Sequence, residues 1–414
     1  MKKTVIELFA GVGGFRVGLN NVKIIDGKVK ENPNFKFVWA NQWEPATTKQ
    51  DAFECYKTRF GSDDDELSNV DISKVDKKKL PDCSLLVGGF PCQDYSVARK
   101  THSTIGIEGK KGVLWWQIND ILKAKKPAFC LFENVNRLVQ SPSKQRGRDF
   151  GIMLRCLVDN GYGVEWRIIN AADYGFGQRR RRIYIFAFRK NTEYYKRISK
   201  FKPNDALSSK TIFAKAFPIE KIASSIDPID MKKDYPSLVE VSDKFHAQFF
   251  NSGILIGSKV YTHNVTPIYV DPTPLSKIVE HTSDKDFYLT EDEKKKFEYL
   301  RGSKQLERVA SNGLKYNYTE GSMSPYDDLS LPGRTMLTSE SSVNRSTHII
   351  KDPKNHRLRF LTPMECERLN CFPDDWTNTG MTQKKRYFMM GNALVCGIIA
   401  KLGIYISEII DDEK

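Results

Sequence analysis

The sequence predicts an α/β fold, a doubly wound and mostly parallel sheet with a smaller domain of irregular and β structure. In the first half of the chain, short apolar runs alternate with amphipathic stretches, which is typical of strands and helices in a parallel sheet. After about residue 190 this alternation fades, and Ser, Thr, Asn, Lys and Pro become frequent. A chain of 414 residues is also long for a single core. We therefore expect two domains, residues 1–190 with 385–414 and residues 191–384.

Apolar runs and amphipathic stretches locate the individual elements of the first domain. The apolar runs predict buried strands at residues 4–9, 35–40, 84–89, 128–133, 163–169 and 183–188. Helix-like segments lie between them, at residues 13–22, 46–60, 114–126 and 150–161. Ligands of such sheets bind beyond the carboxyl ends of the strands, so the unusual residues at those ends are the candidates for a site.

The second half contains fewer regular elements. Residues 283–300 include one charged helix among loops. A further helix is predicted to start with Thr362 as N-cap, Pro363 at the first helical position and Glu365 completing a capping box. The final stretch, residues 391–410, is a helix so apolar that we expect it to pack back on the first domain.

Charge and cysteine content limit the class of function. A net charge of +14 and a pI near 9.2 indicate an anionic partner, of which nucleic acid is the commonest, although many Lys-rich proteins are merely soluble. The eight cysteines form no CxxC pair, so we expect no metal. We see no signal peptide and no apolar run that could cross a bilayer, so we expect free thiols, a cytoplasmic location and no membrane partner.

Two strand ends carry features of a nucleotide site. The first strand leads into "FAGVGGF" (residues 9–15), whose glycines allow close approach of a ligand but lack the spacing typical of NAD sites. The second leads into "NQWEP", where Trp43 could cover an adenine and Glu44 could bind a ribose. Asp71 could accept a hydrogen bond from an adenine amino group. Simple packing for Trp43 and a capping role for Asp71 are the alternatives.

Three further segments carry reactive or charged side chains. Cys92 follows Pro91 in "GGFPCQDYS", directly after an apolar run, although a free cysteine is usually a small buried hydrophobe. Glu133 lies in "FENV" at the next strand end, so a nucleophile and a proton donor would come from neighbouring strands. The run "QRRRR" (residues 178–182) is either a solvated basic face or an anion-binding segment.

The ordered set "FAGVGGF", "GGFPCQ", "ENV", "QRRRRIY", "LTPMECERL" and "GNALV" resembles the DNA cytosine-5 methyltransferases of bacterial restriction–modification systems. The resemblance implies the class I fold of S-adenosylmethionine-dependent methyltransferases. It implies that Cys92 attacks C6 of cytosine and that Glu133 bonds or protonates N3, with Arg180 and Arg182 supplying positive charge. The base that removes the C5 proton is not identified by the sequence, and water is an alternative.

The resemblance also implies S-adenosylmethionine as methyl donor, without a metal. Its candidate contacts are Phe9, Ala10, Gly11, Gly13, Gly14, Phe15, Gln42, Trp43, Glu44, Asp71, Ile72, Gly89, Pro91, Leu114, Asn392, Ala393 and Leu394. Many members have Glu directly before the Trp, where this chain has Gln42. Either Gln42 or Glu44 would then bond the ribose.

Double-stranded DNA is the partner that the resemblance implies, with the target base flipped out of the helix. The long basic loop after Cys92 would close over that base, and residues 191–384 would read the sequence in the major groove. The candidate DNA contacts are Gln93, Ser96, Gln178, Arg334 and Thr335. The C-terminal segments resemble those of members that methylate GGNCC-like sites.

The expected role is protection of host DNA from a cognate restriction endonuclease, which would be a functional and not a physical partner of a monomeric enzyme. Three alternatives remain: a member that acts on tRNA, a catalytically dead relative that only binds DNA, and an oxidoreductase with a dinucleotide-binding sheet. The large separate domain favours duplex DNA over tRNA. Intact Cys92, Glu133 and Arg180 argue against the dead relative, and an oxidoreductase would leave "PCQ", "ENV" and "QRRRR" without a shared role.

Overall fold

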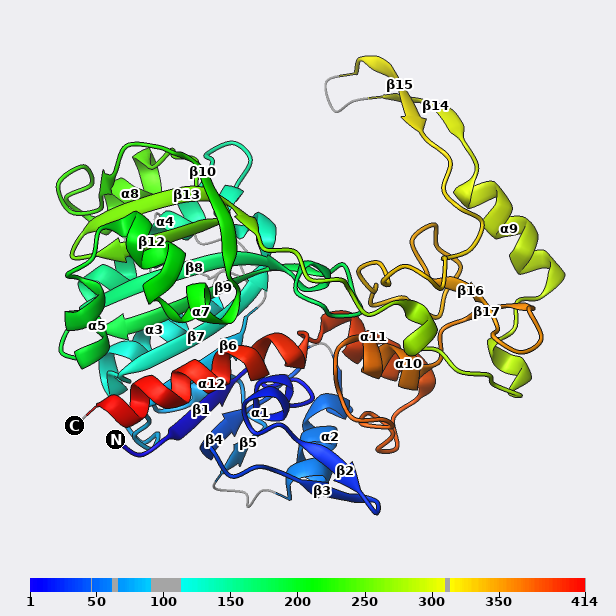
Figure 1. The fold of residues 1–414 in the computed structure, drawn as a ribbon, viewed down its shortest axis with the longest axis horizontal. Coiled ribbons are helices and arrows are strands. Elements are labelled where there is room, and N and C mark those ends of the chain that lie inside the picture. The colour runs from blue at the N-terminus through cyan, green and yellow to red at the C-terminus, as the bar shows by residue number, and fades with distance from the viewer. Residues whose placement is uncertain (46, 62–65, 91–112, 310–312, 414) are drawn as a thin grey trace.

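The computed structural model describes residues 1–45, 47–61, 66–90, 113–309 and 313–413. Figure 1 shows a large lobe around an extended sheet and a small lobe joined to it by several chain crossings. The large lobe consists of residues 1–267 and 396–412, and the small lobe consists of residues 275–392.

One sheet of eleven strands forms the centre of the large lobe. Its strands in spatial order are β10 (Ile219–Ser225), β13 (Lys259–Pro267), β12 (Ser252–Ile256), β8 (Tyr162–Asn170), β9 (Arg181–Arg189), β7 (Phe129–Val135), β6 (Leu85–Gly89), β1 (Thr4–Leu8), β4 (Lys36–Asn41) and β5 (Leu67–Ser68), with β11 (Ile229–Asp230) beside β13. The five strands from β7 to β5 run parallel, and β9 begins an antiparallel half. The predicted α/β fold is confirmed, and all six predicted strands are present.

Both faces of the sheet are covered, which explains why its strands are continuous apolar runs. Alternate side chains point to opposite faces: Val5 and Leu85 belong to one buried cluster, while Ile6 and Leu86 belong to the other. Helices of the large lobe in the first cluster include α1 (Gly14–Leu19), α5 (Glu193–Ile198), α7 (Ile212–Ala216) and α12 (Cys396–Asp412). Those of the second are α3 (Val113–Lys125), α4 (Arg148–Asp159) and α8 (Leu238–Lys244).

The expected domain boundary at residue 191 differs from the structure. Strand β12 pairs with β8, and β13 and β10 follow, so residues 219–267 extend the sheet of the large lobe. Strands β10 and β13 mix polar and apolar residues, which hides them in a simple scan for apolar runs, and β12 is an apolar run of only five residues that was not singled out. The separate small lobe begins only after β13.

The small lobe combines helices with two small antiparallel sheets. Its elements are α9 (Glu291–Arg301), β14 (Lys304–Val309), β15 (Lys315–Glu320), β16 (Ile349–Lys351), β17 (Leu358–Phe360), α10 (Pro363–Leu369) and α11 (Gln383–Asn392). The capping box predicted for α10 is present, with Thr362 and Glu365 bonding each other's backbone N–H groups. The described fold also contains α2 (Asp51–Phe60), the short α6 (Pro203–Asp205), the β2–β3 hairpin (Lys23–Ile25 and Lys28–Lys30) and several short helical turns.

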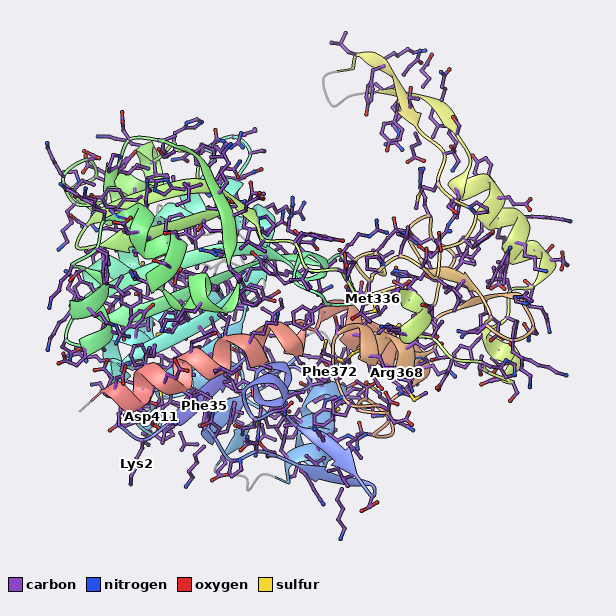
Figure 2. The ribbon with its side chains drawn as sticks, viewed as in Figure 1. Lys2, Phe35, Met336, Arg368, Phe372 and Asp411 are labelled. Carbon is purple, nitrogen blue, oxygen red and sulfur yellow. The ribbon has the colours of Figure 1, made fainter. Side chains whose placement is uncertain are left out.

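Helix α12 returns to the large lobe, as its apolar sequence predicts. Its inner face joins the cluster under α1, and Figure 2 shows Asp411 at its far end close to Lys2 and Phe35 in projection. Within the described ranges, no single helix is long and apolar enough to cross a membrane. The pair α11 and α12, bent by 44°, meets that test only when taken together.

Candidate active site

The glycine-rich turn after β1 forms the floor of the candidate site. Phe9, Gly11 and Gly13 all have positive φ angles, of 54°, 56° and 87°. At Gly13 a side chain is also sterically forbidden, because its Cβ would lie 2.5 Å from a ring carbon of Phe60. The turn therefore brings bare backbone to the carboxyl edge of the parallel strands, where α1 starts.

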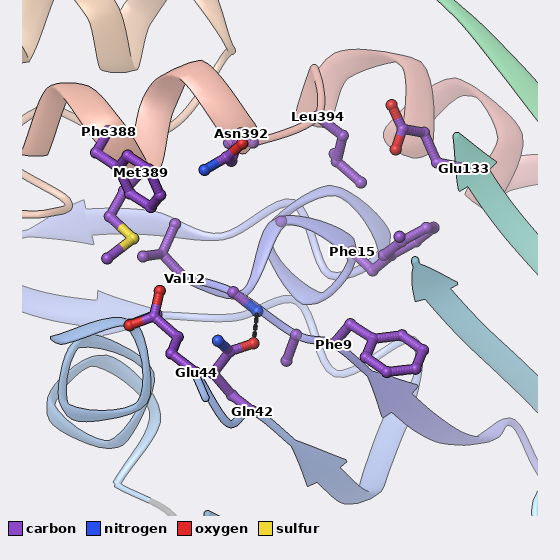
Figure 3. Close-up of a pocket in the computed structure, with 16 residues that line it drawn as sticks. Phe9, Val12, Phe15, Gln42, Glu44, Glu133, Phe388, Met389, Asn392 and Leu394 are labelled. Carbon is purple, nitrogen blue, oxygen red and sulfur yellow. Dashed lines mark hydrogen bonds between the residues drawn. The ribbon is translucent and has the colours of Figure 1, made fainter. Parts of the chain in front are cut away.

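A pocket opens above this turn (Figure 3). Its walls come from the turn itself, the ends of β4, β6 and β7, and helix α11 of the small lobe. The lining residues are Phe9, Ala10, Gly11, Val12, Gly14, Phe15, Gln42, Glu44, Ala52, Gly89, Glu133, Phe388, Met389, Asn392, Ala393 and Leu394. Segments nearly 400 residues apart in sequence thus form one site. Its lining is mostly apolar, with two carboxylates, Glu44 and Glu133.

Gln42 and Glu44 differ in how their side chains are used. Gln42 Oε1 accepts a hydrogen bond of 2.7 Å from the Gly11 N–H, so it holds the turn (Figure 3). Glu44 Oε2 is buried and has no hydrogen-bond partner among the described residues, and burial raises the pKa of Glu44. A buried carboxylate oxygen without a donor is suited to receive a ligand hydroxyl group.

Glu133 lies at the end of β7, between β6 and β9. Its Oε2 lies 3.5 Å from the position that a Cβ on Gly89 would take, so the carboxyl group is in van der Waals contact with the neighbouring strand end. Burial raises the pKa of Glu133, and Arg182 and Arg180 oppose that rise. Arg182 Nε lies 3.2 Å from Glu133 Oε1. A carboxyl group with a raised pKa keeps its proton to a higher pH than an exposed glutamate does, which is what a proton donor requires.

Arg180 is buried beside Glu133 with part of its guanidinium unused. Its Nη2 donates to the Gly391 carbonyl at 3.0 Å, whereas Nε and Nη1 are buried without hydrogen-bond partners among the described residues. Burial, together with Arg182, lowers the pKa of Arg180 to about 10. Unpaired donors of a buried cation are costly, so this group is arranged to meet an acceptor of a bound molecule.

Sequence and fold comparisons give concordant results. The family model described as C-5 cytosine-specific DNA methylase matches residues 3–408. The chain is 47% identical over 410 residues to the type II methyltransferase M.Sau3AI of Staphylococcus aureus, which covers 99% of this chain and 96% of that protein. The chain belongs to the C-5 cytosine-specific DNA methylase family. This protein is therefore a DNA cytosine-5 methyltransferase of the type II restriction–modification kind.

More distant relatives agree with this assignment. The type II methyltransferase M.NlaIV of Neisseria lactamica is 26% identical over 435 residues, covering 95% of this chain and 96% of that one. The crystal structure of the S. pombe Dnmt2 methyltransferase has the same fold, with a TM-score of 0.59 at 15% identity over 100% of this chain and 99% of that chain. Members of the family generally use S-adenosylmethionine as methyl donor.

Most of the residues expected to hold the donor in this methyltransferase line the pocket. Those that do not are Gly13, Trp43, Asp71, Ile72 and Leu114. Trp43 is 37% exposed, whereas Ile72 and Leu114 pack in the core cluster under the sheet. Asp71 accepts a hydrogen bond of 2.9 Å from the Ser73 N–H, which is the capping role considered as an alternative.

Four expected residues lie outside the described part of the chain. These are Pro91, Cys92, Gln93 and Ser96. The last described residue before them, Phe90, has its carbonyl held by Asn134 Nδ2 at 2.7 Å. Asn134 is buried directly after Glu133, so the methyltransferase fixes the entry to the Pro-Cys segment from the same strand that carries the candidate acid.

The structure places the remaining expected DNA contacts in internal networks. Gln178 is fully buried and joins the Asn370 side chain and the Met336 N–H, at 2.9 and 3.1 Å. Arg334 pairs with Asp327, at 2.7 Å from its Nε, and Thr335 Oγ1 donates to the Arg179 carbonyl at 2.6 Å. Gln178 and Thr335 thus join the small lobe to the segment that leads into β9, whereas the ion pair of Arg334 lies within the small lobe.

Four pocket residues were not among the candidates of the sequence analysis, namely Val12, Ala52, Phe388 and Met389. Phe388 and Met389 line the pocket from α11, in the same wall as Asn392 (Figure 3). Their spacing of four and three residues before Asn392 places all three on one helix face. That spacing was the available signal, since Asn392 was already a candidate.

Proposed function

We propose that this enzyme methylates C5 of a cytosine flipped out of a short specific sequence in duplex DNA, using Cys92 as the nucleophile. The observation that carries the proposal is the combination of Glu133, which pairs with Gly89 at the end of β6 and has a raised pKa, with Arg180, whose buried Nε and Nη1 have no partner among the described residues. Duplex DNA agrees with the net charge of +14.

S-adenosylmethionine fits the pocket described above. The unpartnered Glu44 Oε2 would accept from a ribose hydroxyl, while Gln42 holds the glycine turn and leaves its amide N–H₂ as a donor. Phe15, Met389 and Leu394 supply apolar walls. Bound there, the donor supplies an electrophilic methyl group. We therefore assign the ribose contact to Glu44, with Gln42 as the residue that positions the turn.

The chemistry at the cytosine follows from two groups of the chain. Cys92 Sγ, as a thiolate, forms a bond to C6, and N3 takes a proton from Glu133, which leaves C5 as the nucleophilic end of an enamine. Arg180 and Arg182 stabilise the negative charge that Glu133 then carries. After methylation a base removes the C5 proton, the Sγ–C6 bond breaks, and N3 returns its proton to Glu133.

The cytosine must leave the helix to meet these groups, because the Glu133 carboxyl is buried at the end of an internal strand. Flipping costs roughly a few kcal/mol of stacking and pairing. We further propose that the enzyme works as a monomer in the cytoplasm and protects host DNA from a cognate endonuclease. The type II methyltransferases to which it is similar support that role.

The first prediction tests the nucleophile and the reaction together. Duplex DNA containing 5-fluorocytosine should trap a covalent adduct with the protein in the presence of S-adenosylmethionine, because fluorine at C5 cannot leave as a proton. Cys92→Ala should form no adduct, while Cys371→Ala, which changes an exposed cysteine, should match the wild type. Denaturing gel electrophoresis measures the adduct.

Methylation mapping of mixed-sequence DNA then identifies the target. Methylation at one short motif, absent with Cys92→Ala, is the expected result. If DNA binds but is neither trapped nor methylated, duplex DNA is not the substrate, and the same assay with tRNA tests the alternative.

A further inference from the structure

An antiparallel hairpin, formed by β14 and β15, stands clear of both lobes. Figure 1 shows it at the end of α9, extending away from the rest of the chain. Six residue pairs from Lys304↔Glu320 to Val309↔Lys315 form its ladder. None of its residues is buried, which is unusual for a hairpin of this length. Burial of apolar side chains therefore does not explain why the chain forms this two-stranded ribbon.

The register gives the hairpin two different faces, because directly paired residues of an antiparallel ladder share a face. One face carries the pairs Gln305↔Thr319, Glu307↔Asn317 and Val309↔Lys315, here called the amide face. The other carries Lys304↔Glu320, Leu306↔Tyr318 and Arg308↔Tyr316, here called the aromatic face.

The aromatic face connects the hairpin to the small lobe. Arg345 Nη1 lies 2.9 Å from Glu320 Oε2, and the Lys304 Nζ lies 4.2 Å from the centre of the Tyr299 ring on α9. Farther along, the Arg308 guanidinium covers the Tyr318 ring at 3.8 Å. The first two of these contacts join this face of the ribbon to the small lobe, while Leu306 and Tyr316 on the same face remain exposed.

The amide face, in contrast, is free. All six of its side chains are exposed. Within the described residues, neither Gln305 nor Asn317 has a side-chain hydrogen bond, and Glu307, its one carboxylate, is paired with Lys315 at 2.8 Å. The face therefore presents hydrogen-bonding groups in a fixed row without an unpaired negative charge.

The surroundings of the amide face suit DNA. Between residues 294 and 315 the chain has seven lysines and arginines and two acidic residues. A two-stranded β-ribbon fits the major groove of B-DNA, which is about 12 Å wide. Side-chain amides of Asn and Gln bind the N6 and N7 edge of adenine there, and an apolar group such as Val309 can contact a thymine methyl.

We propose that the amide face of the β14–β15 ribbon enters the major groove next to the flipped cytosine, where Asn317 and Gln305 recognise an adenine of the target sequence. This inference rests on the proposed function, since it requires methylation of duplex DNA. In this arrangement Asn317 and Gln305 take the reading role first considered for Arg334 and Thr335, whose side chains bond Asp327 and the Arg179 carbonyl.

The test compares substitutions on the two faces. Asn317→Ala and Gln305→Ala remove the amide groups, and Tyr316→Ala is the matched control on the aromatic face of the same strand. Methylation rates are measured on the wild-type target and on every single-base variant of it. Each amide variant should lose roughly ten- to a hundredfold of the discrimination at one A·T pair, and Tyr316→Ala should retain it.

A second measurement uses duplexes in which 7-deazaadenine replaces adenine. Wild-type enzyme should lose rate on the duplex that lacks the recognised N7, and the amide variant should show no further loss on it. Unchanged discrimination in Asn317→Ala, Gln305→Ala and their combination would overturn the inference while leaving the methyltransferase activity intact. A wild-type enzyme that methylates no duplex DNA would instead overturn the proposed function, and the inference with it.

Discussion

Glu133 is a carboxyl group whose environment decides its protonation. Burial favours the neutral acid, while two arginines favour the carboxylate, and the net result is a raised pKa. A proton donor to cytosine N3 needs this balance. A fully ionised carboxylate has no proton to give, and a buried acid without neighbouring arginines would not readily ionise.

Replacement of Glu133 by Gln should lower the rate of methyl transfer by about 10²- to 10⁴-fold, the usual contribution of a positioned acid. In the wild type, activity should fall as the pH rises through the raised pKa, because the proton is lost. That fall should be absent from the residual activity of Glu133→Gln. Single-turnover methylation over a pH series measures both effects.

Glu44→Gln provides the comparison for this prediction. It also removes a pocket carboxylate, but it should weaken binding of S-adenosylmethionine and leave the rate at saturating donor close to that of the wild type. Equal rates and equal pH profiles for Glu133→Gln and the wild type would show that N3 receives its proton elsewhere.

Among the elements, α1 and α12 form the tightest helix contact next to the site. A Cβ on Gly18 would lie 2.6 Å from the Cys396 carbonyl oxygen and 2.6 Å from Ile399 Cβ. The first of these is backbone at the start of α12 and cannot rotate away. Helix α12 starts at Cys396, two residues after Leu394, and residues 392–394 line the pocket. A shift of α12 away from α1 would therefore also move this wall of the pocket.

Gly18→Ala should therefore destabilise the protein by about 1–3 kcal/mol, the usual cost of overpacking a core. It should also weaken binding of S-adenosylmethionine, because α12 must move away from α1. Urea unfolding and calorimetric titration measure the two effects. Gly321→Ala is the control, since no atom lies within 4 Å of its Cβ position, and equal stability of the two variants would contradict the argument.

The elements also show where sequence reasoning works. The six predicted strands are buried on both faces of the sheet. Each is therefore a run of apolar residues that can be identified from its own sequence, without knowledge of the strand it pairs with. Of the strands between residues 219 and 267, β10 and β13 mix polar and apolar residues and β12 has only five residues, so their place in the sheet follows from the pairing of β12 with β8 and of β13 with β12.

The site was predictable to the same extent. Glycines at positive φ and charged residues at strand ends are local signals, and they led to Gly11, Glu133 and Arg180. The hydrogen bond between Gln42 and Gly11, or the internal use of Gln178 and Arg334, depends on which segments meet in space. No local pattern contains that information.

At the scale of the whole molecule, the two lobes share one core instead of being separate units. Cys366 and Leu369 of α10 and Tyr387 of α11 belong to the same buried cluster as α1 and α12. Within the small lobe the opposite end is held by charge, where Asp327 pairs with Arg301 at 3.2 Å and with Arg334 at 2.7 Å. The hairpin that we assign to DNA reading depends on this charged end, since α9 ends at Arg301.

Asp327 makes the small lobe sensitive to acid. Although burial acts in the opposite direction, the hydrogen bond from Arg334 and the neighbouring charges lower the pKa of Asp327 to about 2, from 3.8 in the unfolded chain. A carboxyl group with a lowered folded-state pKa stabilises the fold above its unfolded pKa, and the effect disappears as the pH falls through the folded value. The contribution at neutral pH is roughly 2 kcal/mol, at about 1.4 kcal/mol per pKa unit.

Asp327→Asn should accordingly lower the free energy of unfolding by at least about 2 kcal/mol at neutral pH, since it also leaves the buried Arg301 and the half-buried Arg334 without their counter-charge. The difference from the wild type should shrink as the pH falls from about 4 toward 2. Urea unfolding followed by tryptophan fluorescence at several pH values measures it. Asp328→Asn, at an exposed neighbour bonded to Ser330, should differ little from the wild type at any pH. A pH-independent gap for Asp327→Asn would show that shape, and not charge, holds this end of the small lobe.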